Sequence, residues 1–190
     1  IMNTTTANIL IVGVGGQGTI LASDILCAAA MEAGLDAKKS EIHGMSQRGG
    51  SVFSHVRFAP KVHSPVIPMG NVDVLVALEE MEAARWVDWL APTGRMVVSG
   101  TRILPANVTA YPEGIVDALK QRVSACLHIP ADRLLEAAGS EKYVNVFLLG
   151  AASKGIDFPE SAWYAAIERL VPPGTADANK AAFIAGRNLS

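Results

Sequence analysis

Short apolar runs alternate with helical patterns in the first half of the chain. Continuous apolar stretches bounded by glycine, proline or polar residues are typical of buried strands. They predict strands over residues 8–14, 52–58, 72–78 and 95–100. Apolar residues that recur every three or four positions predict helices over residues 18–33 and 79–90. Strands and helices in this order indicate an α/β domain.

Two segments of this half have weaker patterns. Residues 52–58 alternate between Val52, Ser54, Val56 and Phe58 on one side and Phe53, His55 and Arg57 on the other. This alternation predicts a half-exposed strand. Residues 36–41 are mostly polar, so they form a short polar strand at most.

From Gly114 onward the pattern is helical. It predicts helices over residues 114–126, 130–138, 143–153, 159–170 and 175–188. No internal repeat, low-complexity tract or linker interrupts the sequence, and its 190 residues suit one domain with a substantial core. We therefore expect a single domain over residues 8–190.

Composition narrows the class of protein. Half of the residues are apolar, 18% are charged, and the net charge of -2 gives no electrostatic footprint for nucleic acid or acidic lipid. Cys27 and Cys126 lie far apart in helix-like stretches, so this chain alone is not expected to hold an iron–sulfur cluster or zinc. We expect a reduced, cytoplasmic location, with no signal peptide and no membrane span.

A glycine-rich loop follows the first predicted strand. Gly13, Gly15 and Gly18 match G-x-G-x-x-G between a strand and a helix, which is the setting of a dinucleotide-binding loop. The acidic residue expected about twenty positions later is missing, because Glu41 comes late. A Walker loop is excluded, because Thr19 stands where its lysine should be. A dinucleotide site, another phosphate site and a tight packing turn all remain open.

A second glycine-bearing loop lies at residues 44–50 and reads GMSQRGG. It has one residue too many for the nucleophile elbow G-x-S-x-G, so a serine hydrolase is not indicated. Arg48, next to Gly49 and Gly50, suits a fixed cationic fork for a carboxylate or phosphate. An exposed arginine in a surface hairpin loop explains the same sequence equally well.

Several other polar residues have both a structural and a functional interpretation. Glu79 and Glu80 end a buried strand, where open α/β sheets bind ligands, but they also suit the positive end of a helix dipole. Asn145 lies in an apolar helix and should need a hydrogen-bond partner. The four histidines lack the spacing of a metal site: His43, His55, His63 and His128.

Five segments together resemble the gamma-type domain of the 2-oxoacid:ferredoxin oxidoreductases. They read ILIVGVGGQGTILASDIL, SEIHGMSQRGGSVFSHVRF, VDVLVALEEMEAARW, VNVFLLGAA and NKAAFIAG. The resemblance extends from about residue 8 to residue 186 and depends on the paired signatures G-x-G-G-Q-G and G-M-S-Q-R-G-G. It implies a three-layer α/β sandwich with a Rossmann-like mixed sheet, glycine-rich loops at the carboxyl edge of that sheet, and a helical C-terminal portion.

The resemblance also implies an activity and partners. The likeness is greatest to the small subunit of the members that act on arylpyruvates, which decarboxylate them oxidatively, form an acyl-CoA and reduce ferredoxin. A large alpha subunit would hold thiamine diphosphate with magnesium and the 4Fe-4S clusters, since this chain has neither the G-D-G signature nor cluster cysteines. The chain would then be a required partner without catalytic residues of its own.

The two glycine loops are the candidate site that this resemblance suggests. We expect them to lie together, face the active site of the alpha subunit, and bind CoA or shield the intermediate. Arg48 would supply charge, Gln17 and Ser46 hydrogen bonds, and the glycines close backbone approach. The candidate residues are Gly13, Gly15, Gly16, Gln17, Gly18, Ser46, Gln47, Arg48, Gly49 and Gly50.

Three alternatives to this function remain. The chain could be the gamma subunit of an enzyme for pyruvate, 2-oxoglutarate or a branched-chain 2-oxoacid, since substrate choice resides in the thiamine-bearing subunit. The pattern G-x-G-x-x-G taken alone favours a free-standing NAD- or flavin-binding oxidoreductase. A non-catalytic binding protein is the third.

Overall fold

A six-stranded mixed sheet forms the centre of the molecule, in the order β2-β3-β1-β4-β5-β6. The computed structural model describes residues 6–43, 50–105 and 109–189. In the sheet β3 is antiparallel to both of its neighbours, whereas β1, β4, β5 and β6 are parallel to one another. The strands are β1 (Ala7–Val14), β2 (Asp36–His43), β3 (Ser51–Ala59), β4 (Val72–Ala77), β5 (Leu90–Ser99) and β6 (Cys126–Ile129).

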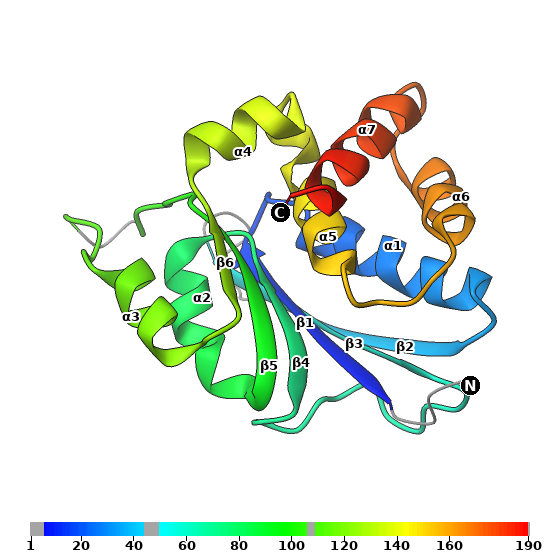
Figure 1. Ribbon diagram of the computed structural model, residues 1–190, viewed down its shortest axis with the longest axis horizontal. Helices are drawn as coiled ribbons and strands as arrows, with labels where there is room; N and C mark the ends of the chain where they lie inside the picture. Colours follow the sequence, from blue (N-terminus) through cyan, green and yellow to red (C-terminus); the bar gives the residue numbers. More distant parts are fainter. Residues whose placement is uncertain (1–5, 44–49, 106–108, 190) are drawn as a thin grey trace.

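Helices cover both faces of the sheet, so the molecule has three layers (Figure 1). One face carries α1 (Thr19–Glu32), α4 (Ala131–Ala138), α5 (Val144–Ser153), α6 (Glu160–Leu170) and α7 (Ala176–Arg187). The other carries α2 (Glu80–Trp86) and α3 (Ile115–Arg122). Short 3-10 turns lie at Val87–Trp89 and Glu141–Tyr143. This arrangement confirms the expected three-layer α/β fold with a helical C-terminal portion.

The central strand β1 is buried on both sides. Ile9 and Ile11 pack into the core shared with α1, while Leu10 and Val12 pack into the core shared with α2. Successive side chains of a strand point to opposite faces, so burial on both faces requires the unbroken apolar run seen in the sequence. The run was therefore a reliable signal for a central strand.

Two predictions for the parallel half of the sheet were wrong. The helix expected over residues 114–126 ends at Arg122, and Cys126 begins the short strand β6 rather than lying in a helix. The four residues of β6 are too few to show a period, and pairing with β5 at Met96 and Val97 decides their conformation. The helix expected over residues 79–90 is also shorter, because β5 already starts at Leu90.

The strand β3 is less exposed than its alternation predicted. His55 is 2% exposed and accepts a hydrogen bond on Nδ1 from the Ile67 N–H (3.2 Å), and burial lowers its pKa. Phe53 packs against Trp86, with ring centroids 4.1 Å apart. The outward side of β3 is therefore covered by α2 and by the segment before β4. The polar edge strand β2 is a full strand and extends beyond residue 41.

Two glycines allow α5 and α7 to pack at very short range. A Cβ on Gly150 would lie 2.1 Å from the Phe183 carbonyl oxygen, and a Cβ on Gly186 would lie 1.9 Å from the Phe147 carbonyl oxygen. Both distances are far below van der Waals contact, so neither position accepts a side chain unless the helices separate. These glycines belong to the sequence segments VNVFLLGAA and NKAAFIAG, which carry part of the resemblance.

We predict that Gly186→Ala destabilises the protein although alanine is the better helix former. Forcing the two helices apart should cost about 1–3 kcal/mol of the free energy of unfolding, measured by urea denaturation. Ala181→Ser, on the exposed side of α7, is the control and should change stability by less than about 0.5 kcal/mol. An unchanged Gly186→Ala variant would contradict the close helix contact.

Candidate functional site

The carboxyl ends of the parallel strands meet at one edge of the sheet. After β1 the chain enters α1 on one face, whereas after β4 it enters α2 on the other. The position between the carboxyl ends of β1 and β4 is therefore a topological switch point, the place where open α/β sheets bind ligands. The glycine loop (residues 13–18) lies on one side of this switch point, and Leu78 and Glu79 follow β4 on the other.

The two predicted loops are joined through their backbones. The Gly15 N–H donates to the Gly50 carbonyl oxygen at 2.9 Å, directly before β3 begins at Ser51. Of the second loop's candidate residues only Gly50 is among the described residues. Ser46, Gln47, Arg48 and Gly49 lie outside them.

Gln17 spans the switch point with its side chain. Its Oε1 accepts a hydrogen bond from the Val14 N–H (2.7 Å), and its Nε2 donates to the Leu78 carbonyl oxygen (2.8 Å). Both ends of the carboxamide are thus used by the protein's own backbone, which links the end of β1 to the end of β4. The sequence suggested that this amide would serve a ligand, and it gave no signal for the link.

Close packing within the protein explains the positions of Gly13 and Gly18. A Cβ on Gly13 would lie 2.9 Å from Gln17 Oε1 and 3.0 Å from Thr19 Oγ1. Gly18 has a positive φ of 81°, and a Cβ there would lie 2.4 Å from Asn145 Nδ2. Both glycines are needed for close packing, as one of the interpretations of the motif predicted.

Asn145 has the hydrogen-bond partner that its place in an apolar helix required. Its Nδ2 donates to the Gly18 carbonyl oxygen (3.2 Å), so α5 holds the end of the glycine loop. Its Oδ1 and the Thr19 hydroxyl are buried without a partner among the described residues. The C-terminal helices thus position the loop directly.

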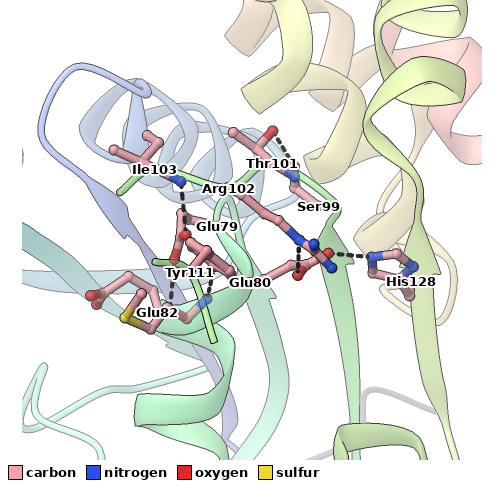
Figure 2. Close-up of polar contacts among 10 residues, drawn as sticks. Glu79, Glu80, Glu82, Ser99, Thr101, Arg102, Ile103, Tyr111 and His128 are labelled. Carbon is pink, nitrogen blue, oxygen red and sulfur yellow. Dashed lines mark hydrogen bonds and ion pairs between the residues drawn. The ribbon is translucent and has the colours of Figure 1, made fainter. Parts of the chain in front are cut away.

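Three buried glutamates lie on the α2 side of the switch point. Glu79, Glu80 and Glu82 are 1%, 2% and 5% exposed, and they occupy the start of α2 (Figure 2). The sequence interpretation favoured a helix-dipole role for the first two. Their position in the first turn fits that role, but each carboxylate also holds a separate segment of the edge.

Glu79 fixes the segment that follows β5. Its Oε2 accepts from the Glu82 N–H (2.9 Å), which caps α2, and its Oε1 accepts from the Ile103 N–H (3.1 Å) and the Tyr111 hydroxyl (2.5 Å). Tyr111 also accepts from the Met81 N–H (2.8 Å). Burial and the neighbouring Glu79 carboxylate raise the pKa of Tyr111, so the phenol stays protonated and donates.

Glu80 binds two cationic or potentially cationic side chains. Arg102 Nε donates to its Oε2 at 2.7 Å, and His128 Nε2 lies 3.1 Å from its Oε1 (Figure 2). The hydrogen bond from Arg102 to Glu80 raises the pKa of that guanidinium. Because His128 comes from β6, this carboxylate connects α2 with the far side of the parallel sheet.

Glu82 connects α2 with the start of β3. Its Oε2 accepts from the Ser51 hydroxyl (2.5 Å) and from Trp86 Nε1 (3.3 Å), and its Oε1 accepts from Arg85 Nε (3.1 Å). Ser51 directly follows the second glycine loop. All three carboxylates are therefore occupied by donors, and the cluster acts as a scaffold for the edge rather than as an open acid–base site.

The described residues contain neither a group of side chains for a metal ion nor a helix that could cross a membrane. Within residues 6–43, 50–105 and 109–189, no three His, Cys, Asp or Glu side chains are grouped closely enough to hold a metal ion. Cys27 and Cys126 lie on α1 and β6, and burial raises the pKa of Cys27 to about 11 and also that of Cys126. Among the described helices, none combines the length and apolar character needed to cross a membrane.

Sequence comparison relates the whole chain to one family. The family model described as pyruvate ferredoxin/flavodoxin oxidoreductase matches residues 8–189. Indolepyruvate oxidoreductase subunit IorB of Archaeoglobus fulgidus is 42% identical, covering 75% of this chain and 74% of that protein. The same subunit of Thermococcus kodakarensis is 37% identical over 94% of this chain and 93% of that protein. The 2-oxoglutarate synthase subunit KorC of Methanothermobacter thermautotrophicus is 32% identical over 95% and 93%.

Solved structures share the fold. The gamma subunit of a keto/oxoacid ferredoxin oxidoreductase from Geobacter sulfurreducens matches with a TM-score of 0.68 and 26% identity, covering 95% of each chain. Pyruvate oxidoreductase subunit PORC from Thermotoga maritima matches with a TM-score of 0.70 and 25% identity, covering 95% of this chain and 94% of that one.

We predict that Glu79 and Tyr111 are energetically coupled. Glu79→Gln and Tyr111→Phe should each lower the free energy of unfolding by about 1–3 kcal/mol, because each removes part of a buried hydrogen-bonded pair. The double variant should lose about 0.5–3 kcal/mol less than the sum, measured by urea denaturation.

Tyr164→Phe on α6 is the control, because the Tyr164 hydroxyl has no hydrogen-bond partner among the described residues. Strict additivity of Glu79→Gln and Tyr111→Phe would show that the contact contributes nothing to the edge.

Proposed function

Because the chain belongs to the pyruvate ferredoxin/flavodoxin oxidoreductase family, we propose that it is the small subunit of an indolepyruvate:ferredoxin oxidoreductase. The observation that carries the proposal is the near end-to-end match to subunits of that name, at 37% identity over 94% of this chain. Residues 8–190 then form a single gamma-type domain, in agreement with the extent of the family match.

The proposed reaction is the oxidative decarboxylation of an arylpyruvate. The carboxylate leaves as CO2, the CoA thiol loses its proton and forms a thioester with the remaining acyl group, and two ferredoxins each accept one of the two electrons released. Thiamine diphosphate with magnesium, together with 4Fe-4S clusters, would supply the decarboxylation and electron-transfer chemistry on a large alpha subunit. The two partly buried, widely separated cysteines of this chain support a cluster held by that partner.

In the complex, this chain contributes the edge of its sheet where the parallel strands have their carboxyl ends. This edge lies against the active site of the alpha subunit. The glycine loop offers backbone at close range, since Gly16 is exposed and a Cβ there would meet open space. In the second loop Arg48 supplies positive charge for the CoA phosphates, Ser46 and Gln47 supply hydrogen bonds, and Gly49 and Gly50 supply close approach. Gln17 acts on this surface through the loop that it holds.

Exposed apolar side chains near this edge support a partner contact. Ile20 in the first turn of α1 is 39% exposed, Ile42 near the end of β2 is 51% exposed, and Leu104 after β5 is 48% exposed. Apolar side chains that remain uncovered near a proposed site are typical of an interface. We propose a cytoplasmic complex, in keeping with the two free cysteines.

A related function has support from one comparison. The identity of 32% with a 2-oxoglutarate synthase subunit favours, as the second candidate, the gamma subunit of an enzyme for another 2-oxoacid. The residues at the carboxyl edge do not separate the two, because the choice of 2-oxoacid belongs to the thiamine-bearing partner in both.

The test is to purify the chain from its native source with an affinity tag and to assay the complex that accompanies it. We expect a large iron–sulfur subunit to co-purify, and ferredoxin reduction to require both CoA and an arylpyruvate. Indolepyruvate and phenylpyruvate should exceed pyruvate and 2-oxoglutarate by at least about tenfold in kcat/KM, a difference of about 1.4 kcal/mol. A preference for 2-oxoglutarate would establish the second candidate instead.

Arg48→Ala tests the role of the second loop. Loss of one charge-assisted contact should raise the KM for CoA about 10- to 100-fold and leave the KM for the 2-oxoacid unchanged. Assembly with the large subunit should persist. Arg169→Ala on α6 is the matched control, because it removes an exposed ion pair with Glu32 at the end of α1. Normal CoA kinetics in Arg48→Ala would exclude this role.

A further inference from the structure

The glycine loop has the sequence pattern of a dinucleotide site, but the side chain of Gln17 in this loop lies where the ligand would bind. In a dinucleotide-binding sheet the pyrophosphate lies at the switch point and accepts hydrogen bonds from the loop and the helix N-terminus. Here the Gln17 carboxamide lies at that switch point, between the Val14 N–H on the β1 side and the Leu78 carbonyl on the β4 side.

Three backbone N–H groups at this loop are already used within the protein. Val14 donates to Gln17 Oε1 at 2.7 Å, Gly15 donates to the Gly50 carbonyl at 2.9 Å, and Gln17 itself donates to the Val14 carbonyl at 3.1 Å. An entering phosphate would have to displace these acceptors, because each N–H group serves one strong acceptor at a time. Gln17 Oε1 thus accepts the hydrogen bond that a phosphate oxygen would accept.

The space made by the first and the last glycine of the motif is filled as well. The absence of a Cβ at Gly13 makes room for Gln17 Oε1 and Thr19 Oγ1, and the absence of one at Gly18 makes room for Asn145. In a dinucleotide site the first of these positions allows the tight turn and the last lets the helix pack on the strand. In this protein both are taken up by internal contacts.

The strand order also separates the loop from the strand that would carry a ribose partner, as far as the described residues show. In a dinucleotide fold the acidic residue ends the strand that follows the first helix. Here that strand is β2, and the antiparallel strand β3 separates it from β1. Glu41 on β2 forms an ion pair with Lys39.

We infer that Gln17 is a specificity-determining residue that closes this Rossmann-like edge to dinucleotides by acting as an internal ligand for the glycine loop. A diphosphate, including that of CoA, is therefore kept out of the switch point and can meet only the outer side of the loop. The inference holds for either 2-oxoacid substrate considered above, and it removes the free-standing NAD- or flavin-dependent oxidoreductase as a function.

The first experiment titrates the wild-type protein with NADH and with ADP-ribose by fluorescence and calorimetry. We expect no saturable binding up to millimolar concentrations, because the site is occupied from within. Binding of either ligand at micromolar concentrations would overturn the inference without any variant, and would leave the proposed subunit function to be judged by its own assay.

The second experiment compares Gln17→Ala with Gln17→Met. Each loses the two hydrogen bonds, so each should melt roughly 4–8 °C below the wild type. Alanine also vacates the switch point, whereas methionine refills it with apolar atoms. Inorganic pyrophosphate should therefore raise the melting temperature of Gln17→Ala in a saturable manner, and it should not stabilise Gln17→Met or the wild type beyond a sulfate control.

Gln121→Ala, at an exposed position of α3, is the matched control and should behave as the wild type does. Equal responses of Gln17→Ala and Gln17→Met to pyrophosphate would overturn the inference, and so would a Gln17→Ala variant as stable as the wild type. If Gln17→Ala does not fold, Gln17→Asn takes its place, since its shorter carboxamide also leaves room at the switch point.

Discussion

Burial of three carboxylates in the first turn of α2 is the constraint on which the carboxyl edge depends. An ionised carboxylate without partners in an apolar interior is strongly unfavourable, so Glu79, Glu80 and Glu82 must each be met by donors. Their partners come from three separate segments: Arg102, Ile103 and Tyr111 after β5, His128 of β6, and Ser51 at the start of β3. The loops around the edge are therefore held in one arrangement, as a surface that a partner subunit recognises should be.

The glycine loop is held from the other face of the sheet by packing between helices. Gly150 and Gly186 bring α5 and α7 together, and α5 places Asn145 against Gly18. Segments that are far apart in the sequence thus contact one another around the glycine loop. The contact between α5 and α7 positions Asn145, and Asn145 in turn holds the end of the glycine loop at the switch point. Each of these contacts needs a close approach that only glycine permits.

The same glycine motif can therefore serve either ligand binding or internal packing. G-x-G-x-x-G allows a backbone to approach something closely, and here that partner is the chain itself, through Gln17, Thr19 and Asn145. A loop held by internal contacts before any ligand arrives lowers the entropic cost of forming an interface on its outer side. This fits a subunit that completes another chain's active site better than it fits an independent dehydrogenase.

The sequence by itself determined the strands β1 and β4, the helices α1 and α4 to α7, the glycine loop and the family, because long apolar periods and glycine spacing are local properties. Only the tertiary structure decided three further features. The strand β6 depends on pairing with β5, the burial of His55 depends on neighbours far along the chain, and the roles of Gln17 and the α2 glutamates depend on which backbone groups face them. Hydrogen bonds that join residues 22 to 61 positions apart leave no periodic trace in the sequence, since their geometry exists only after the sheet has formed.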